Sequence, residues 1–318
     1  MPAASLSRRA HAPLIFPAIL VSCGLLLSLS ACQSAPAAEE ADNLSVVTSF
    51  YPLQFIAERI GGDAVTVTNL TKPGAEPHDL ELSPQQVAAL ADSDLAVRLS
   101  GFQPAVDDAF DVAGPPATFD ARPYADLSLT YSPIEESSTT GTSEPSPDPH
   151  FWLDPMRLAN VADALAAKLA SLDPEHAEEF SNNARTLRGD LTGLDTELRR
   201  GLADCANEDL VTSHTAFGYF ADAYGLQQVG IAGLTPESEP DPGALTAVTD
   251  FVEANDVHTI YFETLVSPDI AETIAGATGA TTAVLDPLEG LSDASDGDNY
   301  LEIMRSNLAQ LQRGQPCT

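Results

Sequence analysis

Apolar residues recur every three or four positions through the middle of the chain, which predicts two consecutive amphipathic helices between residues 155 and 204. The second begins at Asp173-Pro174, where Asp is a favoured cap and Pro a favoured first helical residue. Its apolar face is Ala177, Phe180, Ala184, Leu187, Leu191, Leu194, Leu198 and Leu202. A helix of about 29 residues would span roughly 43 Å. We therefore expect residues 173–204 to form a rigid strut between two lobes.

Short apolar runs alternate with helical segments on both sides of this strut. These runs cover residues 44–50, 65–70, 94–99, 209–213, 228–231, 258–262 and 282–285. Alternation of strands and helices favours parallel sheets. The pattern predicts an α/β fold with two lobes, residues 44–172 and 205–318, each containing a parallel sheet flanked by helices.

Residues 1–31 have the pattern of a secretory leader. Two arginines precede an apolar run that ends at Leu29-Ser30-Ala31-Cys32, small residues before a Cys that would be acylated. A membrane-spanning helix is the alternative, but Pro17 interrupts the run, which is short for a span. We expect Cys32 to anchor the mature chain to the lipid bilayer outside the cytoplasm. Residues 32–43 would be a flexible tether.

The composition is strongly acidic, with 14 Lys and Arg against 47 Asp and Glu and a net charge of −33. Removal of the leader takes away two arginines and no acid, which leaves 12 basic residues, 47 acidic residues and a net charge of −35. Phosphates would be repelled, so no nucleic-acid partner is expected. The mature chain keeps Cys205 and Cys317 besides Cys32, and an exported chain with such a pair predicts a disulfide between them.

The histidines supply the candidate chemistry. His150 lies between two Asp-Pro steps that hold the backbone extended, and His78 and His214 also lie in loop-like or strand-end positions beside carboxylates. A turn with an incidental His is the alternative at residue 150. His176 stands among acidic residues and is expected to be solvated, and His258 begins its strand at the opposite edge of the sheet.

Ligands bind at the carboxyl ends of parallel strands, where His78, His214 and Asp286 are expected. Three neutral imidazoles and one carboxylate form a tetrahedral set suited to zinc, so we predict His78, His150, His214 and Asp286 as metal ligands. Glu81 and Glu263 could orient imidazoles by accepting hydrogen bonds, although Glu263 could also be a ligand.

The chain from about residue 44 to residue 317 resembles the metal-binding lipoproteins of bacterial ABC importers for zinc and manganese. The motifs that carry the resemblance are Pro77-His78-Asp79-Leu80-Glu81, Asp148-Pro149-His150-Phe151-Trp152-Leu153-Asp154-Pro155, Thr212-Ser213-His214-Thr215-Ala216-Phe217 with Tyr219-Phe220, and Thr235-Pro236-Glu237-Ser238-Glu239-Pro240. The resemblance implies a metal in the cleft between two lobes, with ligands at His78, His150 and His214 and an acidic ligand near Asp286. A His at the third position tends to accompany zinc in this family. Residues 132–147, which would form a mobile loop, contain no His.

The leading prediction is a protein that is not an enzyme, captures extracytoplasmic Zn²⁺ and delivers it to the permease of an ABC importer. A manganese carrier of the same fold is the first alternative, although three imidazoles suit Mn²⁺ less well than an oxygen-rich set. An anchored zinc hydrolase is the second, but the chain has no His-Glu-x-x-His motif. We expect the protein to be a monomer whose partners are the permease and the bilayer.

Overall fold

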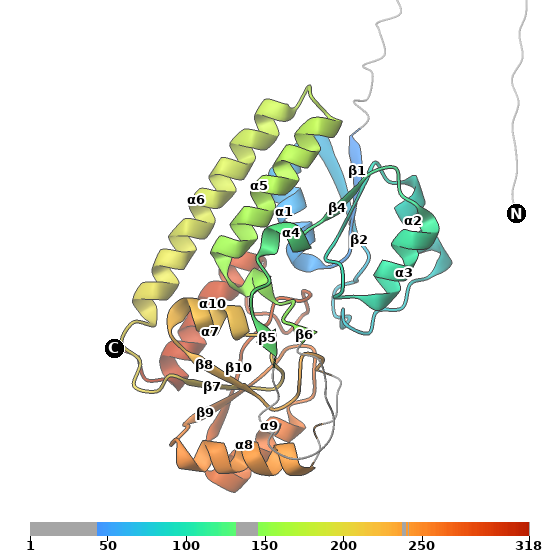
Figure 1. Cartoon of the computed structure of the whole chain (residues 1–318). Coiled ribbons are helices and arrows are strands. Elements are labelled where there is room, and N and C mark those ends of the chain that lie inside the picture. The colour runs from blue at the N-terminus through green and yellow to red at the C-terminus, as the bar shows by residue number, and fades with distance from the viewer. Residues whose placement is uncertain (1–42, 132–145, 237–239, 241, 318) are drawn as a thin grey trace, which may run out of the picture. The chain divides into compact units, whose positions relative to one another are not determined.

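The computed structural model describes residues 43–131, 146–236, 240 and 242–317 (Figure 1). The first lobe contains a parallel sheet in the order β2-β1-β3-β4. The elements up to the central helices are β1 (Leu44–Thr48), α1 (Tyr51–Gly61), η1 (Gly62–Ala64), β2 (Val65–Asn69), α2 (Pro84–Asp92), β3 (Leu95–Arg98), α3 (Pro104–Ala113), β4 (Thr118–Asp120), α4 (Arg122–Ala125), β5 (Thr130–Tyr131), β6 (Ser146–Pro147) and η2 (Phe151–Leu153). The predicted parallel sheet of this lobe is confirmed.

Local sequence explains where the helices of this lobe begin. Pro lies in the first turn of α1, α2 and α3, where its missing N–H costs nothing. Ser83 and Gln86 form a capping box that starts α2. Neither α3 nor β4 was predicted from the sequence. The edge strand β4 has only three residues and one buried side chain, so it has almost no periodicity of its own.

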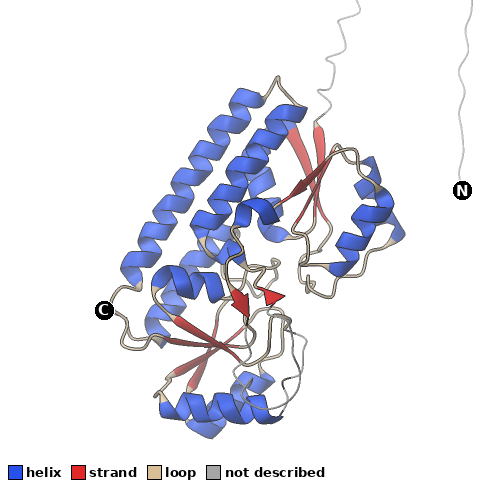
Figure 2. Cartoon of the chain, in the orientation of Figure 1, coloured by secondary structure: helices blue, strands red, loops and turns tan. Residues whose placement is uncertain are grey.

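The second lobe also contains a sheet flanked by helices (Figure 2). Its strands are parallel and have the order β10-β9-β7-β8. Its elements are β7 (Asp209–Thr212), α7 (Gly218–Tyr224), β8 (Gln227–Gly230), α8 (Pro242–Ala254), β9 (Thr259–Phe262), α9 (Asp269–Thr278), β10 (Thr281–Val284) and α10 (Tyr300–Gly314). The four predicted strand–helix units are present. The carboxyl ends of these strands lead into the loops that carry His214, Glu263 and residues 285–291.

The helices α5 (Pro155–Leu172) and α6 (Ala177–Gly201) form an antiparallel pair, and α6 links the two lobes. Helix α6 contacts α1 in the first lobe and α10 in the second. It starts four residues later than Asp173, the predicted cap. The Asp173 carboxylate instead accepts the backbone N–H groups of Glu175 and His176, which makes a turn before the helix. The buried face of α6 includes Phe180, Leu187 and Leu194, as the periodicity predicted.

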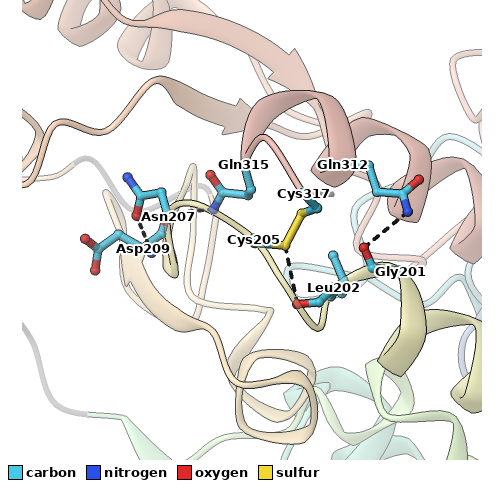
Figure 3. The surroundings of a disulfide bond; sticks show 8 residues. All are labelled: Gly201, Leu202, Cys205, Asn207, Asp209, Gln312, Gln315 and Cys317. Carbon is cyan, nitrogen blue, oxygen red and sulfur yellow. Dashed lines mark hydrogen bonds between the residues drawn. A yellow bond between two sulfur atoms is a disulfide. The ribbon is translucent and has the colours of Figure 1, made fainter.

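The chain end is joined to the start of the second lobe by a disulfide between Cys205 and Cys317 (Figure 3). The same region is held by hydrogen bonds from Gln312 Nε2 to Gly201 O (3.1 Å) and from Gln315 Nε2 to Asp209 O (2.7 Å). The predicted disulfide is therefore present, and it ties the C-terminal end of α10 to the segment that follows α6.

Several expectations fall on residues outside the described ranges: the leader, the acylated Cys32, all of the tether but Asn43, and residues 132–145 of the expected loop. The loop prediction is wrong at its last two residues, because Ser146–Pro147 pair with Thr130–Tyr131 as two antiparallel strands. Among the described residues, none of the helices combines the length and the hydropathy that a membrane span requires.

Candidate metal centre

His78 lies in the loop between β2 and α2 and is 9% exposed. The buried Gln103 side chain donates to Pro77 O (3.1 Å) and to Thr71 Oγ1 (3.1 Å), which fixes the backbone beside His78. The Phe102 ring meets the imidazole edge to face, with ring centroids 4.6 Å apart. The Phe102 ring thus holds the His78 imidazole by packing, and Gln103 holds the backbone of the preceding residue, Pro77.

His150 is fully buried at the start of η2. Asp148 Oδ1 accepts the backbone N–H of His150 (2.9 Å) and lies 2.7 Å from its Nδ1. The carboxylate therefore favours the tautomer with the proton on Nδ1 and leaves Nε2 available as a ligand atom. The only Trp, Trp152, packs edge to face on this imidazole and donates to Pro287 O (2.8 Å) in the second lobe.

His214 is fully buried in the loop after β7. Its backbone N–H (3.1 Å) and its Nδ1 (2.6 Å) both contact Oε1 of Glu263, the residue that follows β9. This arrangement matches that of Asp148 and His150, since in both pairs one carboxylate oxygen contacts the backbone N–H and the ring Nδ1 of the same His. Glu263 thus lies behind His214, where it orients the imidazole and presents Nε2 inward.

The three imidazoles converge on Glu289. Glu289 Oε1 lies 3.3 Å from His78 Nε2, 3.1 Å from His150 Nε2 and 3.2 Å from His214 Nε2. The four ligand atoms all lie within 4.8 Å of one another, and all four residues are buried. In the part of the chain that the structure describes, this is the one group of three or more His, Cys, Asp or Glu side chains arranged to hold a metal ion. Three imidazole nitrogens and one carboxylate oxygen suit tetrahedral zinc.

The expectation of Asp286 as the fourth ligand is corrected to Glu289. Asp286 Oδ1 accepts the backbone N–H of Leu288 (2.8 Å), and its Oδ2 accepts the Ser295 hydroxyl (2.7 Å). Leu288 has φ 58°, a left-handed conformation that L-residues rarely adopt. Asp286 thus stabilises the turn that brings Glu289, three residues later, inward. The sequence shows that acidic residues follow β10, but it does not show the turn that decides which of them faces the imidazoles.

Two more carboxylates differ from the sequence-based expectation. Glu81 is exposed, so the proposed role in orienting His78 is wrong; Phe102 and the backbone of Pro77 hold that residue instead. Asp148, which the sequence analysis treated only as part of an Asp-Pro turn, is the acceptor behind His150. Its position two residues before a His is a signal that could have been used.

The electrostatics of the group make protons competitors for a bound cation. Burial raises the pKa of Glu289, but the imidazoles around it outweigh burial and hold the pKa well below its usual value. Burial lowers the pKa of His214, yet Glu263 and Glu289 together raise it to about 10. Burial also lowers the pKa of His150, but Asp148 and Glu289 raise it overall, whereas burial prevails at His78 and lowers its pKa. Any metal that binds must displace protons.

The remaining described histidines lie outside this group. His176 Nδ1 is 2.5 Å from Asp173 Oδ2, and its side chain is 40% exposed. His258 directly precedes β9 and so lies at the amino end of that strand, at the edge opposite the metal group. Both placements agree with their exclusion from the predicted ligand set.

Comparisons with known proteins agree with this geometry. The family model described as zinc-uptake complex component A, periplasmic, matches residues 46–314. The high-affinity zinc uptake system protein ZnuA of Bacillus subtilis is 33% identical over 92% of this chain and 95% of its own length. The zinc-binding lipoprotein AdcA of Streptococcus pneumoniae is 33% identical over 90% of this chain, which spans only 58% of AdcA. The crystal structure of the Zn(II)-bound ZnuA-like domain of that AdcA has a TM-score of 0.71 and 33% identity, covering 86% of this chain and 99% of that domain.

Proposed function

Because this chain belongs to the family of periplasmic zinc-uptake components, we propose that it captures Zn²⁺ outside the cytoplasm and delivers it to an ABC importer. The observation that carries the proposal is the convergence of Nε2 of His78, His150 and His214 with Oε1 of Glu289. The ligands come from loops of both lobes, so a bound ion would hold the lobes together, and a relative motion of the lobes would release it. The family consists of transport binding proteins rather than enzymes.

The ligand set favours carriage over hydrolysis. A catalytic zinc keeps three protein ligands and an open position for water. Here Glu289 lies about equally far from all three imidazoles, at 3.1 to 3.3 Å, which supports a closed four-ligand site. The site also favours zinc over manganese, since three imidazoles and a single carboxylate are a poor match to the oxygen-rich sets that Mn²⁺ prefers. Relatives named for zinc binding support the same choice.

The location and partners follow from the leader and the relatives. AdcA of Streptococcus pneumoniae is named a lipoprotein, and the Leu29-Ser30-Ala31-Cys32 sequence supports acylation of Cys32 here. We propose a monomer attached to the outer face of the cell membrane through that lipid, with the importer's permease as its protein partner. The flexible tether of residues 32–43 would let the domain reach the permease.

Metal content of the purified mature protein tests the proposal. We expect one Zn²⁺ per chain and retention of zinc against an equal concentration of Mn²⁺. Replacement of His150 or His214 by Ala should abolish retention, whereas His258→Ala and His176→Ala should keep it. Equal retention of Mn²⁺ would favour the manganese alternative, and loss of zinc from the two control variants together with retention in the other two would contradict the site.

A further inference from the structure

The first residues of α7 contact Asp148, the residue whose carboxylate lies behind His150. The Tyr219 hydroxyl donates to Asp148 O (3.2 Å) and accepts the backbone N–H of Leu129 (3.2 Å). Asp148 N in turn donates to Leu129 O (3.0 Å). Tyr219 is 1% exposed, so its hydroxyl depends on these partners rather than on water. One phenol from the second lobe therefore binds the residue before β5 and the residue after β6, and the latter leads directly to His150.

Gly218 contacts the Asp148 carboxylate itself. A Cβ atom placed on Gly218 would lie only 2.5 Å from Asp148 Oδ2, closer than real Cβ contacts allow. The glycine therefore lets this carboxylate oxygen pack against the main chain of α7. The other oxygen, Oδ1, receives both nitrogens of His150. Asp148 is thus held at its backbone by Tyr219, and its carboxylate has room beside α7 because residue 218 is Gly.

The Tyr219 ring is held from the other side by the first lobe. The guanidinium of Arg157 lies over the ring, 4.5 Å from its centroid, a favourable cation–π arrangement. Arg157 is fixed in turn by Asp126 Oδ2 (3.0 Å) and Asp154 Oδ2 (3.3 Å). The Arg157 contact with the ring and the two hydrogen bonds of the hydroxyl together limit the freedom of Tyr219 to move.

We propose that Gly218 and Tyr219 are positioning residues for the metal site, which hold Asp148 so that Nε2 of His150 stays aimed at the ion and the ion leaves slowly. This inference rests on the proposed function. Both residues follow His214 within five positions, so one segment of the second lobe carries a ligand and also sets the orientation of another. Outer groups that contact a metal ligand typically change affinity by 10–100-fold when mutated. Tyr219 acts one contact further out, so we expect an effect of about 3- to 10-fold.

The test compares Tyr219→Phe with Tyr224→Phe in the mature protein loaded with one Zn²⁺. Tyr224 is a matched control, since it lies on the same helix, is 8% exposed and gives its hydroxyl to Asp195 Oδ1 (3.2 Å), away from the site. Release of zinc to a chelator should be about 3- to 10-fold faster in Tyr219→Phe and within twofold of the unchanged protein in Tyr224→Phe. In protein labelled at histidine, the ¹H–¹⁵N signals of the His150 ring should shift in the first variant alone.

Gly218→Ala supplies a second perturbation, and Gly276→Ala is its control, because a Cβ at Gly276 meets no atom within 4 Å. We expect faster zinc release from Gly218→Ala and no change from Gly276→Ala. Equal release rates and unchanged His150 signals in Tyr219→Phe and Tyr224→Phe would overturn the positioning role even if Gly218→Ala had an effect. A chain that retains no zinc before any substitution would instead refute the proposed function.

Discussion

Replacing Glu289 by Gln isolates the contribution of the carboxylate at the centre of the site. The substitution keeps the shape of the side chain and removes its charge. Glu289 Oε1 is 3.1 to 3.3 Å from three imidazole nitrogens and is 2% exposed, so no water or neighbouring acid can take its place without rearrangement. We therefore expect the change to weaken zinc binding much more than it weakens the fold.

The magnitude follows from what the side chain contacts. Loss of a group behind a ligand costs 10–100-fold in affinity, so loss of a charged ligand should cost at least about 100-fold, or about 2.7 kcal/mol. At a free zinc concentration a thousandfold above the unchanged Kd, zinc stabilises the fold by about 4.1 kcal/mol, and a 100-fold weaker site leaves about 1.4 kcal/mol. With about 2–4 °C of Tm per kcal/mol, the zinc-dependent shift should fall from roughly 8–16 °C to roughly 3–6 °C.

Thermal unfolding with and without zinc measures this increment, and Asp286→Asn is the matched control. Asp286 lies in the same loop and is also buried, but its oxygens bind Leu288 N and the Ser295 hydroxyl rather than the imidazoles. Asn keeps an oxygen that can accept the Leu288 N–H, so the turn that brings Glu289 inward should persist, whereas the acceptor of the Ser295 hydroxyl is lost. Asp286→Asn should therefore lower Tm in both conditions and reduce the difference between them much less than Glu289→Gln does. Loss of the increment in Asp286→Asn together with its retention in Glu289→Gln would identify Asp286, and not Glu289, as the fourth ligand.

Three further predictions concern protons, the disulfide and the anchor. The pKa of His214 is raised to about 10, above the usual 6.5, so zinc must displace a proton there at pH 7. Calorimetry should show a binding enthalpy that depends on the buffer's heat of ionisation, with affinity falling as the pH drops towards 5; a buffer-independent enthalpy would contradict this. Reduction of Cys205–Cys317, which closes a loop with a sequence separation of 112, should lower the free energy of unfolding by up to about 4.7 kcal/mol and leave the zinc increment intact. Cys32→Ala should move the protein from the membrane to the soluble fraction, and its retention on the membrane would argue against lipid anchoring.

The sequence determined the architecture because the information for it is local. Apolar spacing along α6 specified a long amphipathic helix, and alternation of strand and helix specified two parallel sheets. Parallel sheets collect the carboxyl ends of their strands at one edge, which is why His214 and Glu263 could be placed together without coordinates. His78, after a strand, and His150, between two Asp-Pro steps, were predicted in the same way, and the family motifs supported them, but the sequence does not show how closely the three rings approach.

The fourth ligand was decided only by tertiary contacts. Whether Asp286 or Glu289 faces the imidazoles depends on a turn with a left-handed Leu288, held by the Ser295 hydroxyl and by Asn307, whose amide exchanges hydrogen bonds with the backbone of Asp286. These partners lie 9 and 21 residues further along the chain, beyond the reach of any local pattern. The same holds for Asp148, which is placed by Tyr219 from the other lobe. A strand's end can be read from its own residues, but the direction of a side chain beyond that end is set by whatever packs against the loop.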